Sequence, residues 1–210
     1  MRIRNVKNKE ILNKSPYLVK ECKNYKGKWS SLFSNNNPIY LEIGSGKGKF
    51  IIDMALKYPN INFIALDRFD NIIIKLLNRL EKYNKIPNLL VIKEDASVLG
   101  EIFNTHEINT LFLNFSDPWP KLRHEKRRLT YKTYLDIYKN LDIKDIYLKT
   151  DNRGLFEYSI ISIINSSYKI KEISLDLHAD NEEIITTDYE EKFLKLNKQI
   201  YYLKASLINI

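Results

Sequence analysis

Two kinds of apolar segment alternate along most of this chain, and this alternation restricts the possible folds more than any other feature. Short runs of large apolar residues predict buried strands, and between them apolar residues recur at helical spacing. The expected strands are residues 39–43, 62–66, 89–92, 111–115, 146–150, 169–177 and 199–205. The expected helices are residues 50–58, 72–80, 98–103, 130–141 and 155–164. Strand–helix alternation favours parallel pairing, so the sequence predicts an α/β fold with a doubly wound, mostly parallel sheet of seven strands and helices on both faces.

The length of 210 residues and the hydrophobic content of 44% suit one domain with a sizeable core. We expect this domain over residues 38–210, after a basic N-terminal arm over residues 1–37 that shows no clean periodicity. No apolar run has the length of a membrane span, and the basic start lacks the apolar stretch of a signal peptide. The single cysteine, Cys22, fits a reducing compartment. We therefore expect a cytoplasmic protein without a membrane partner, a metal site or an evident obligatory protein partner.

Positive charge is concentrated in two short segments of the chain. The formal net charge is +8; residues 1–28 contain nine Lys or Arg and two Glu, and residues 121–132 contain six Lys or Arg and one Glu. Such clustering favours a phosphate-rich partner, and nucleic acid is the partner that it fits best. The alternative is that each basic run is a solvated face.

A rigid turn follows the strand expected at residues 111–115. Pro118 and Pro120 flank Trp119 and exclude both helix and sheet pairing there. Asp117 should therefore lie just past the carboxyl end of a strand, at the edge where α/β sheets bind ligands. A basic run follows at once. The ordinary alternatives are a turn-forming Asp and a packing corner, but the combination favours a site for a planar ring carried on a phosphate backbone.

A glycine-rich turn joins the first expected strand and helix. Gly44 and Gly46 allow a ligand to approach the backbone, but Lys49 follows Gly48, which matches neither a phosphate-binding loop nor a dinucleotide loop well. The third possible ligand, S-adenosylmethionine, is cationic and calls for acids. Acids stand within the first expected strand and at the ends of the next two, at Glu42, Asp67 and Asp95. Their alternative role is helix capping.

Five motifs resemble those of bacterial tRNA (guanine-N7-)-methyltransferases, and the resemblance covers nearly the whole chain. The motifs lie at residues 41–48, 114–121, 123–128, 149–154 and 187–190, and the most specific is Asn-Phe-Ser-Asp-Pro-Trp-Pro. The resemblance implies a Rossmann-like class I methyltransferase fold with the last strand antiparallel. It also implies S-adenosylmethionine as the methyl donor, tRNA as the partner, and methylation of guanine N7 in the variable loop.

The resemblance also implies roles for individual residues. Donor binding falls on Glu42, Gly44, Gly46, Asp67, Asp95 and Asp117, and Asp117 is also the catalytic residue. Substrate contacts fall on Lys121, Asp151, Thr187, Asp188, Tyr189 and Glu190. RNA contacts fall on Arg123, His124, Glu125, Lys126, Arg127 and Arg128. Two positions depart from the family pattern: Asp67 is more often Glu, and Leu122 is commonly basic.

Guanine N7 carries a lone pair and no proton, so its methylation needs positioning rather than a general base. Asp117 would stabilise the positive charge that develops on the purine or accept hydrogen bonds from its edge, with Trp119 as packing or stacking support. Two alternatives stay open. One is an RNA methyltransferase that modifies an exocyclic amine, because Asp-Pro-Trp loosely resembles the turn of amino-methyltransferases. The other is a non-catalytic tRNA-binding protein that keeps the fold.

Overall fold

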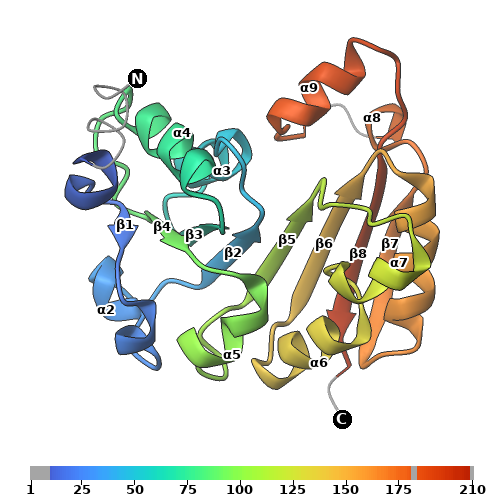
Figure 1. Cartoon of the computed structure of the whole chain (residues 1–210), viewed down its shortest axis with the longest axis horizontal. Helices are drawn as coiled ribbons and strands as arrows, with labels where there is room; N and C mark the ends of the chain where they lie inside the picture. The colour runs from blue at the N-terminus through green and yellow to red at the C-terminus, as the bar shows by residue number, and fades with distance from the viewer. Residues whose placement is uncertain (1–9, 181–183, 209–210) are drawn as a thin grey trace.

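The structure is a computed structural model that describes residues 10–180 and 184–208. Within these residues one mixed sheet of eight strands has the order β1-β4-β3-β2-β5-β6-β8-β7 (Figure 1). The strands are β1 (Leu18–Val19), β2 (Ile39–Ile43), β3 (Asn62–Asp67), β4 (Leu89–Lys93), β5 (Thr110–Asn114), β6 (Asp145–Thr150), β7 (Tyr168–Ser174) and β8 (Tyr201–Leu207). Only the pairs that β8 makes with β6 and β7 are antiparallel. The predicted fold class is confirmed, with β1 as an eighth strand.

Helices cover both faces of the sheet. They are α2 (Ser30–Phe33), α3 (Lys49–Lys57), α4 (Asp70–Leu80), α5 (Leu99–Ile102), α6 (Lys132–Asn140), α7 (Arg153–Ile164), α8 (Leu177–Asp180) and α9 (Asp188–Leu194), with 3-10 turns η1 (Cys22–Tyr25), η2 (Ala96–Val98) and η3 (Leu122–Arg127). Helices α3 and α4 bury Ile52 and Leu76 in one hydrophobic core. Helices α6 and α7 bury Leu135 and Phe156 in a second core. The two cores give the doubly wound, layered arrangement that the alternation predicts.

The order of the strands creates a switch point between β2 and β5. The chain leaves β2 toward β3 and β4, and it then returns to place β5 on the other side of β2 (Figure 1). The connections that follow β2 and β5 therefore diverge at the carboxyl edge of the sheet. Open α/β sheets bind ligands in the crevice that this divergence leaves.

Residues 10–37, which the sequence led us to expect as a basic arm, pack against the sheet. Strand β1 pairs with β4, and the backbone N–H of Val91 donates to the carbonyl oxygen of Tyr17 over 2.8 Å. Trp29 is fully buried, and its indole N–H donates to the carbonyl oxygen of Ile102 over 2.7 Å. The sequence shows no periodicity here because the segment is a series of short irregular pieces, and the buried residues among 10–37 are Cys22, Trp29 and Phe33. The first nine residues of the expected arm lie outside the described residues.

Helix α9 is absent from the helices expected from the sequence, in which residues 187–190 stand out only as a motif with substrate contacts. Thr187 is its N-cap residue, and a reciprocal capping box joins Thr187 and Glu190. This Thr-x-x-Glu pattern is the sequence signature of a helix start. Figure 1 shows α9 above the carboxyl edge of the sheet, where the switch point opens.

Candidate active site

A cavity of about 670 Å³ occupies the switch point. Its walls come from the carboxyl ends of β2, β3 and β5, from the glycine turn after β2, from the turn after β5 and from the start of α9. The predicted residues that line it are Glu42, Gly44, Gly46, Asp67, Asp95, Asp117, Arg127, Thr187, Asp188 and Tyr189. The structure thus brings residues from six segments of the chain to one place.

The glycine turn has a backbone that side chains would disturb. Gly44, Gly46 and Gly48 all have positive φ, between 57° and 79°. A Cβ atom on Gly48 would come within 2.7 Å of the Leu76 side chain, so this glycine lets α3 pack closely on α4. A Cβ atom on Gly44 would meet nothing within 4 Å. Gly44 therefore serves the backbone turn and leaves its cavity side open to a ligand.

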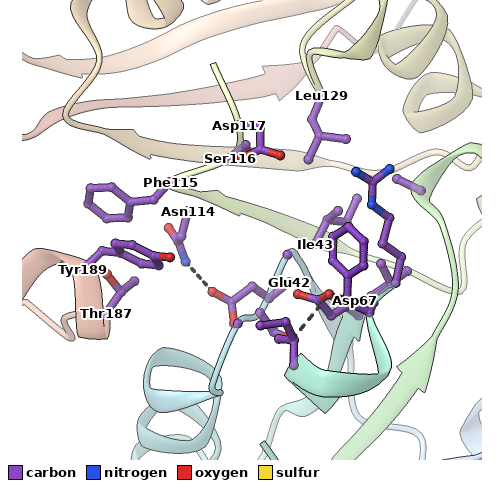
Figure 2. Close-up of a pocket in the computed structure, with 18 of the residues that line it drawn as sticks. Glu42, Ile43, Asp67, Asn114, Phe115, Ser116, Asp117, Leu129, Thr187 and Tyr189 are labelled. Atoms are coloured by element: carbon purple, nitrogen blue, oxygen red, sulfur yellow. Dashed lines mark hydrogen bonds between the residues drawn. The ribbon is translucent and has the colours of Figure 1, made fainter. Parts of the chain in front are cut away.

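Glu42 lies at the bottom of the cavity and is almost fully buried. The Asn114 side-chain amide donates to Glu42 Oε1 over 2.8 Å, and Figure 2 shows this bond bridging β2 and β5. Burial raises the pKa of Glu42 to about 8, although Asn114 and Lys149 oppose the shift. Within the described part of the chain, three buried side-chain oxygens here lack a hydrogen-bond partner: Glu42 Oε2, Asn114 Oδ1 and Ser116 Oγ.

These three atoms test whether the cavity fits S-adenosylmethionine. Buried polar atoms without partners are rare in folded proteins, and a bound ligand is one common reason for them. Asn114 Oδ1 can only accept hydrogen bonds, and the same holds for Glu42 Oε2 when the carboxyl group is ionised. Together the two atoms suit a positively charged group that donates hydrogen bonds. The amino group of S-adenosylmethionine is such a group. The residues present therefore fit this donor.

The other two strand-end acids already make hydrogen bonds within the chain. Asp67 Oδ1 accepts from the backbone N–H of Phe69, and burial raises the pKa of Asp67 despite its backbone hydrogen bonds. Asp95 caps η2 by accepting from the N–H of Ser97, and it pairs with Arg68 at 3.3 Å. Burial opposes ionisation of Asp95, but hydrogen bonds from Ser97 and Arg68 outweigh it and lower its pKa. Both acids thus combine capping with a position on the cavity wall, and each carboxylate keeps lone pairs for a ligand.

Asp117 lies on the turn after β5, across the cavity from Asp67 (Figure 2). Its side chain is exposed, in contrast to buried Glu42. The turn holds two non-glycine residues with positive φ, Phe115 at 52° and Trp119 at 42°. Such conformations are costly and cluster at functional sites. They direct the Phe115 ring toward α9 and leave the Asp117 carboxylate free to meet a second substrate.

Three ion pairs with Lys and Arg side chains fasten helix α9 over the cavity, and His178 of α8 also lies 3.3 Å from Glu190 Oε1. Asp188 forms a bidentate pair with Arg79 of α4, with N–O distances of 2.8 and 2.9 Å. Glu191 pairs with Lys49 of α3 at 3.2 Å. The third pair is buried: Lys149 Nζ of β6 lies 3.0 Å from Glu190 Oε1 and also donates to the carbonyl oxygen of Ile185. The first two pairs join α9 to helices α4 and α3, and the third joins it to strand β6 on the other side of the switch point.

The predicted contact residues at 187–190 therefore have different surroundings. Thr187 and Glu190 cap α9 and are buried, and Asp188 is held by Arg79. Tyr189 is 57% exposed and lies over Phe115, with ring centroids 6.1 Å apart and planes 22° apart. Figure 2 shows the two rings at one end of the cavity. Tyr189 is the residue of this group best placed to touch a substrate.

The remaining predicted residues lie outside the cavity lining. Lys121, Arg123, His124, Glu125 and Lys126 lie on or beside η3, next to the turn that carries Asp117. Asp151 follows β6, and its Oδ2 atom lies 3.7 Å from Nζ of Lys198. Arg128 contacts the Asp117 turn itself.

Sequence reasoning missed five residues that shape the site: Lys49, Arg79, Asn114, Phe115 and Lys149. Asn114 was the one polar residue in an apolar strand, which is a signal for a functional side chain. The three cations carried no such signal, because a basic residue on a helix or strand is usually solvated. Their partners on α9 lie 41 to 142 positions away along the chain.

Comparison with solved structures shows the same fold in other methyltransferases. The 16S rRNA methyltransferase KamB superposes with a TM-score of 0.65 at 13% identity, covering 87% of this chain and 94% of that chain. An antibiotic-related methyltransferase gives 0.64 at 15% identity, with coverages of 93% and 98%. A 16S rRNA (adenine(1408)-N(1))-methyltransferase of Catenulisporales acidiphilia, a variant solved with S-adenosylmethionine, gives 0.60 at 10% identity, with coverages of 87% and 91%. At these identities the likeness concerns the fold alone.

Sequence comparison finds much closer relatives. A family described as putative methyltransferase matches residues 36–203. The tRNA (guanine-N(7)-)-methyltransferase of Oceanobacillus iheyensis is 47% identical over 201 residues, which cover 94% of each chain. The enzyme of the same name from Streptococcus suis is 46% identical and covers 98% of this chain and 99% of its own. That from Brevibacillus brevis is 44% identical and covers 99% of both.

The chain has the fold of class I methyltransferases, with a cavity at its switch point, and the match to the family model and to close relatives makes it a methyltransferase. It is therefore a transferase of one-carbon groups. Within this class the chain belongs to the tRNA (guanine-N(7)-)-methyltransferase family. The family resemblance that the sequence motifs indicated is confirmed.

Proposed function

We propose that this chain methylates N7 of a guanine in the variable loop of tRNA, with S-adenosylmethionine as donor. The observation that carries this proposal is the position of the Asp117 turn. It forms one wall of the donor cavity and continues directly into the basic turn η3. A base that reaches Asp117 would therefore enter from a phosphate backbone held at η3. Membership of the family supports the same reaction.

The donor would lie along the carboxyl ends of β2, β3 and β4. Glu42 and Asn114 would accept hydrogen bonds from its amino group, Asp67 from its ribose hydroxyls and Asp95 from its adenine amino group. When bound, S-adenosylmethionine supplies an electrophilic methyl group on a sulfonium. The backbone of Gly44 and Gly46 allows close approach because neither residue has a side chain.

Asp117 would act on the acceptor guanine. The N7 atom needs no deprotonation, and it becomes part of a cationic ring when it is methylated. A carboxylate beside the ring stabilises that charge, and it can also accept hydrogen bonds from the guanine N1–H and amino group. Tyr189 and Phe115 would limit where the ring can lie, because they close one end of the cavity. The remaining contribution is in-line positioning of N7 against the methyl group.

The tRNA backbone would lie against the exposed cations of η3. Lys121, Arg123 and Lys126 are exposed, and none of them forms an ion pair with another residue of the described chain. Unpaired cations beside an active site suit phosphate contacts. No helix in the described residues has the length and apolar character to cross a membrane. A cytoplasmic location, where tRNA is found, is part of the proposal.

A tRNA with 7-deazaguanine in place of the candidate guanine tests the modified atom. The replacement removes the N7 lone pair and keeps the amino and carbonyl edge. We expect methyl incorporation into unmodified tRNA and none at the 7-deazaguanine nucleotide. Labelled methyl at that nucleotide would instead support transfer to the exocyclic amine, and no transfer to any tRNA would support a non-catalytic tRNA-binding protein.

A further inference from the structure

The turn that presents Asp117 has a costly conformation and needs support from outside itself. Trp119 has a φ of 42°, which is unfavourable for a residue with a large side chain. Pro118 and Pro120 have no backbone N–H to contribute to hydrogen bonding. Within the described residues no backbone N–H donates to the carbonyl oxygen of Pro118 or Trp119, so donors from the chain must be side chains.

Arg128 supplies these donors. Its Nε donates to the carbonyl oxygen of Pro118 over 3.1 Å, and its Nη2 donates to that of Trp119 over 3.0 Å. One edge of the guanidinium group thus grips two successive carbonyls, as it would grip a carboxylate or phosphate. The Cζ atom of the guanidinium group also lies 4.2 Å from the ring centre of Tyr158 on α7. The Nε–Nη2 edge and one face of the group are therefore occupied within the chain.

The other residues of the basic run fall into two groups. Arg127 lies 4.7 Å from the Trp119 ring centre, and His124 meets the same ring edge-on at 5.7 Å. Lys121, Arg123 and Lys126 point to solvent. Arg128 is half-buried, unlike these three. The run thus combines three cations that are free for phosphates with two, Arg127 and Arg128, that contact other side chains or carbonyl groups of the chain.

We propose that Arg128 is a positioning residue for methyl transfer, which holds the Asp117 turn in place, and that it is not a phosphate ligand. This proposal rests on the proposed function only for its kinetic test. Tyr158 contributes to the same positioning, because its ring packs on the guanidinium group of Arg128 and holds the orientation of its plane. Loss of the fork should let the turn relax and move Asp117 away from the acceptor base. Displacement of about 1 Å at a reacting centre can lower the rate by about a hundredfold.

The charge-conserving substitution Arg128→Lys separates positioning from phosphate binding. A lysine keeps the positive charge but cannot donate to both carbonyls from one planar fork. We expect kcat to fall roughly tenfold to a hundredfold, with KM for tRNA and the salt dependence of tRNA binding as in the wild type. Arg128→Met should show the same loss of kcat and the same salt dependence. Arg153→Lys, at an exposed site on α7, is the matched control and should keep the wild-type kcat.

A phosphate ligand would behave in the opposite way. Arg128→Lys would then keep kcat, and Arg128→Met would flatten the log–log salt slope of tRNA binding by roughly one unit. Either of these results would overturn the proposal. Arg123→Met is the comparison variant for a true phosphate contact, and it should flatten the slope.

Tryptophan fluorescence tests the same inference without any activity measurement. Trp29 is fully buried, so acrylamide quenching reports mainly on Trp119, which is partly exposed. We expect a steeper quenching slope and red-shifted emission for Arg128→Lys, and wild-type behaviour for Arg123→Lys. Unchanged fluorescence in Arg128→Lys would show that the turn holds without the fork. If the wild type methylates no tRNA, the proposed function fails while this measurement still decides the role of Arg128.

Tyr158→Leu completes the test through a double-mutant cycle. The substitution removes the ring beneath Arg128 at a position outside the cavity lining. If both residues act through one fork, Tyr158→Leu should lower kcat alone but add little to Arg128→Lys. Effects on kcat that multiply in the double variant would overturn the shared role.

Discussion

Glu42 and Asp117 are both carboxylic acids on the wall of one cavity, yet their surroundings give them opposite properties. Glu42 is buried, hydrogen-bonded to Asn114 and has a pKa raised to about 8. Asp117 is exposed on a strained turn. The first can change its charge when a cationic donor binds, and the second meets the acceptor base from the solvent side. At the residue scale, burial rather than residue type separates the two roles.

Removal of the charge from Asp117 should slow methyl transfer without harm to the fold. We expect Asp117→Asn to lower kcat by roughly a hundredfold, the usual effect when an electrostatic partner of the transition state is lost. Thermal stability should stay close to that of the wild type, because the side chain is exposed. Single-turnover methyl transfer to unmodified tRNA measures the first quantity, and calorimetry measures the second. A stable variant with near-normal kcat would contradict the role of Asp117.

The raised pKa of Glu42 makes donor binding depend on pH. The donor's amino group would bind the ionised carboxylate, so protonated Glu42 must first lose its proton. Affinity for S-adenosylmethionine should therefore rise between pH 6 and pH 8, by up to about tenfold per unit. Titration calorimetry in two buffers with different ionisation enthalpies would detect the released proton. The Glu42→Gln variant should bind S-adenosylmethionine weakly at every pH and release no proton. An affinity of the wild type that does not change with pH would refute the mechanism.

The same pKa makes an opposite prediction for the stability of the free protein. In the folded protein Glu42 holds its proton up to about pH 8, whereas in the unfolded chain it loses its proton near the ordinary pKa of 4.5. The folded state therefore binds more protons between these values, and the contribution of Glu42 to stability falls as the pH rises. Urea unfolding of wild type and Glu42→Gln at pH 5 and pH 8 isolates this contribution. The wild type should lose more stability than the variant over this range.

At the scale of elements, α9 is held by charges rather than by a large apolar face. Lys149 is the innermost of its three partners: its side chain is 8% exposed, and that of Glu190 is fully buried. The ammonium group joins β6 to the segment before α9 through Ile185 and to α9 through Glu190. Helix α9 in turn carries Tyr189 to the cavity. Its position therefore depends on ion pairs with the scaffold.

Loss of the Lys149 charge should cost substantial stability. Lys149→Met leaves the buried Glu190 carboxylate without its lysine partner, and the loss of one partner of a buried pair usually costs about 3–5 kcal/mol. Lys149→Met combined with Glu190→Gln should recover part of that loss, because no unpaired charge is left behind. Urea unfolding curves for both variants provide the measurement. An equal or larger loss in the double variant would mean that the pair acts only through packing.

At the scale of the whole molecule, the arrangement places the donor cavity, the Asp117 turn and the basic turn η3 side by side at the carboxyl edge of the sheet. Two cations of residues 10–37 have a different environment. Lys23 pairs with Glu101, and Lys26 donates to the carbonyl oxygen of Gly100. Their charge is partly used within the fold. The surface beside Asp117 is therefore the better candidate for tRNA contact.

Lys121, Arg123 and Lys126, the exposed cations on and beside η3 that form neither an ion pair nor a ring contact within the described residues, should set the salt dependence of tRNA binding. Neutralisation of Lys121, Arg123 and Lys126 together should flatten the log–log salt slope by roughly one unit for each lost phosphate contact. Binding of S-adenosylmethionine should be unaffected, because these residues lie outside the cavity lining. Filter binding of tRNA at several salt concentrations measures the slope. An unchanged slope would identify η3 as a solvated face.

Sequence patterns alone established the α/β class, the order of the main strands and helices, and the positions of Glu42, Asp67, Asp95 and Asp117 near strand ends. These are local properties: apolar periodicity reports which face of an element is buried, and proline and glycine report where an element stops. The motifs also indicated the family. Helix α9 could have been found from its Thr-x-x-Glu cap, which the sequence contains.

Only the tertiary structure decided which side chains meet. Asn114 reaches Glu42 from 72 positions away, and Arg79 reaches Asp188 from 109 positions away. The sequence placed Arg128 in a run expected to contact RNA and Lys149 at the start of a family motif, but only the structure shows that one is engaged with the Asp117 turn and that the other is buried against α9. The physical reason is that long-range hydrogen bonds and ion pairs depend on how the elements pack, and a periodic pattern carries no information about the partner of a side chain.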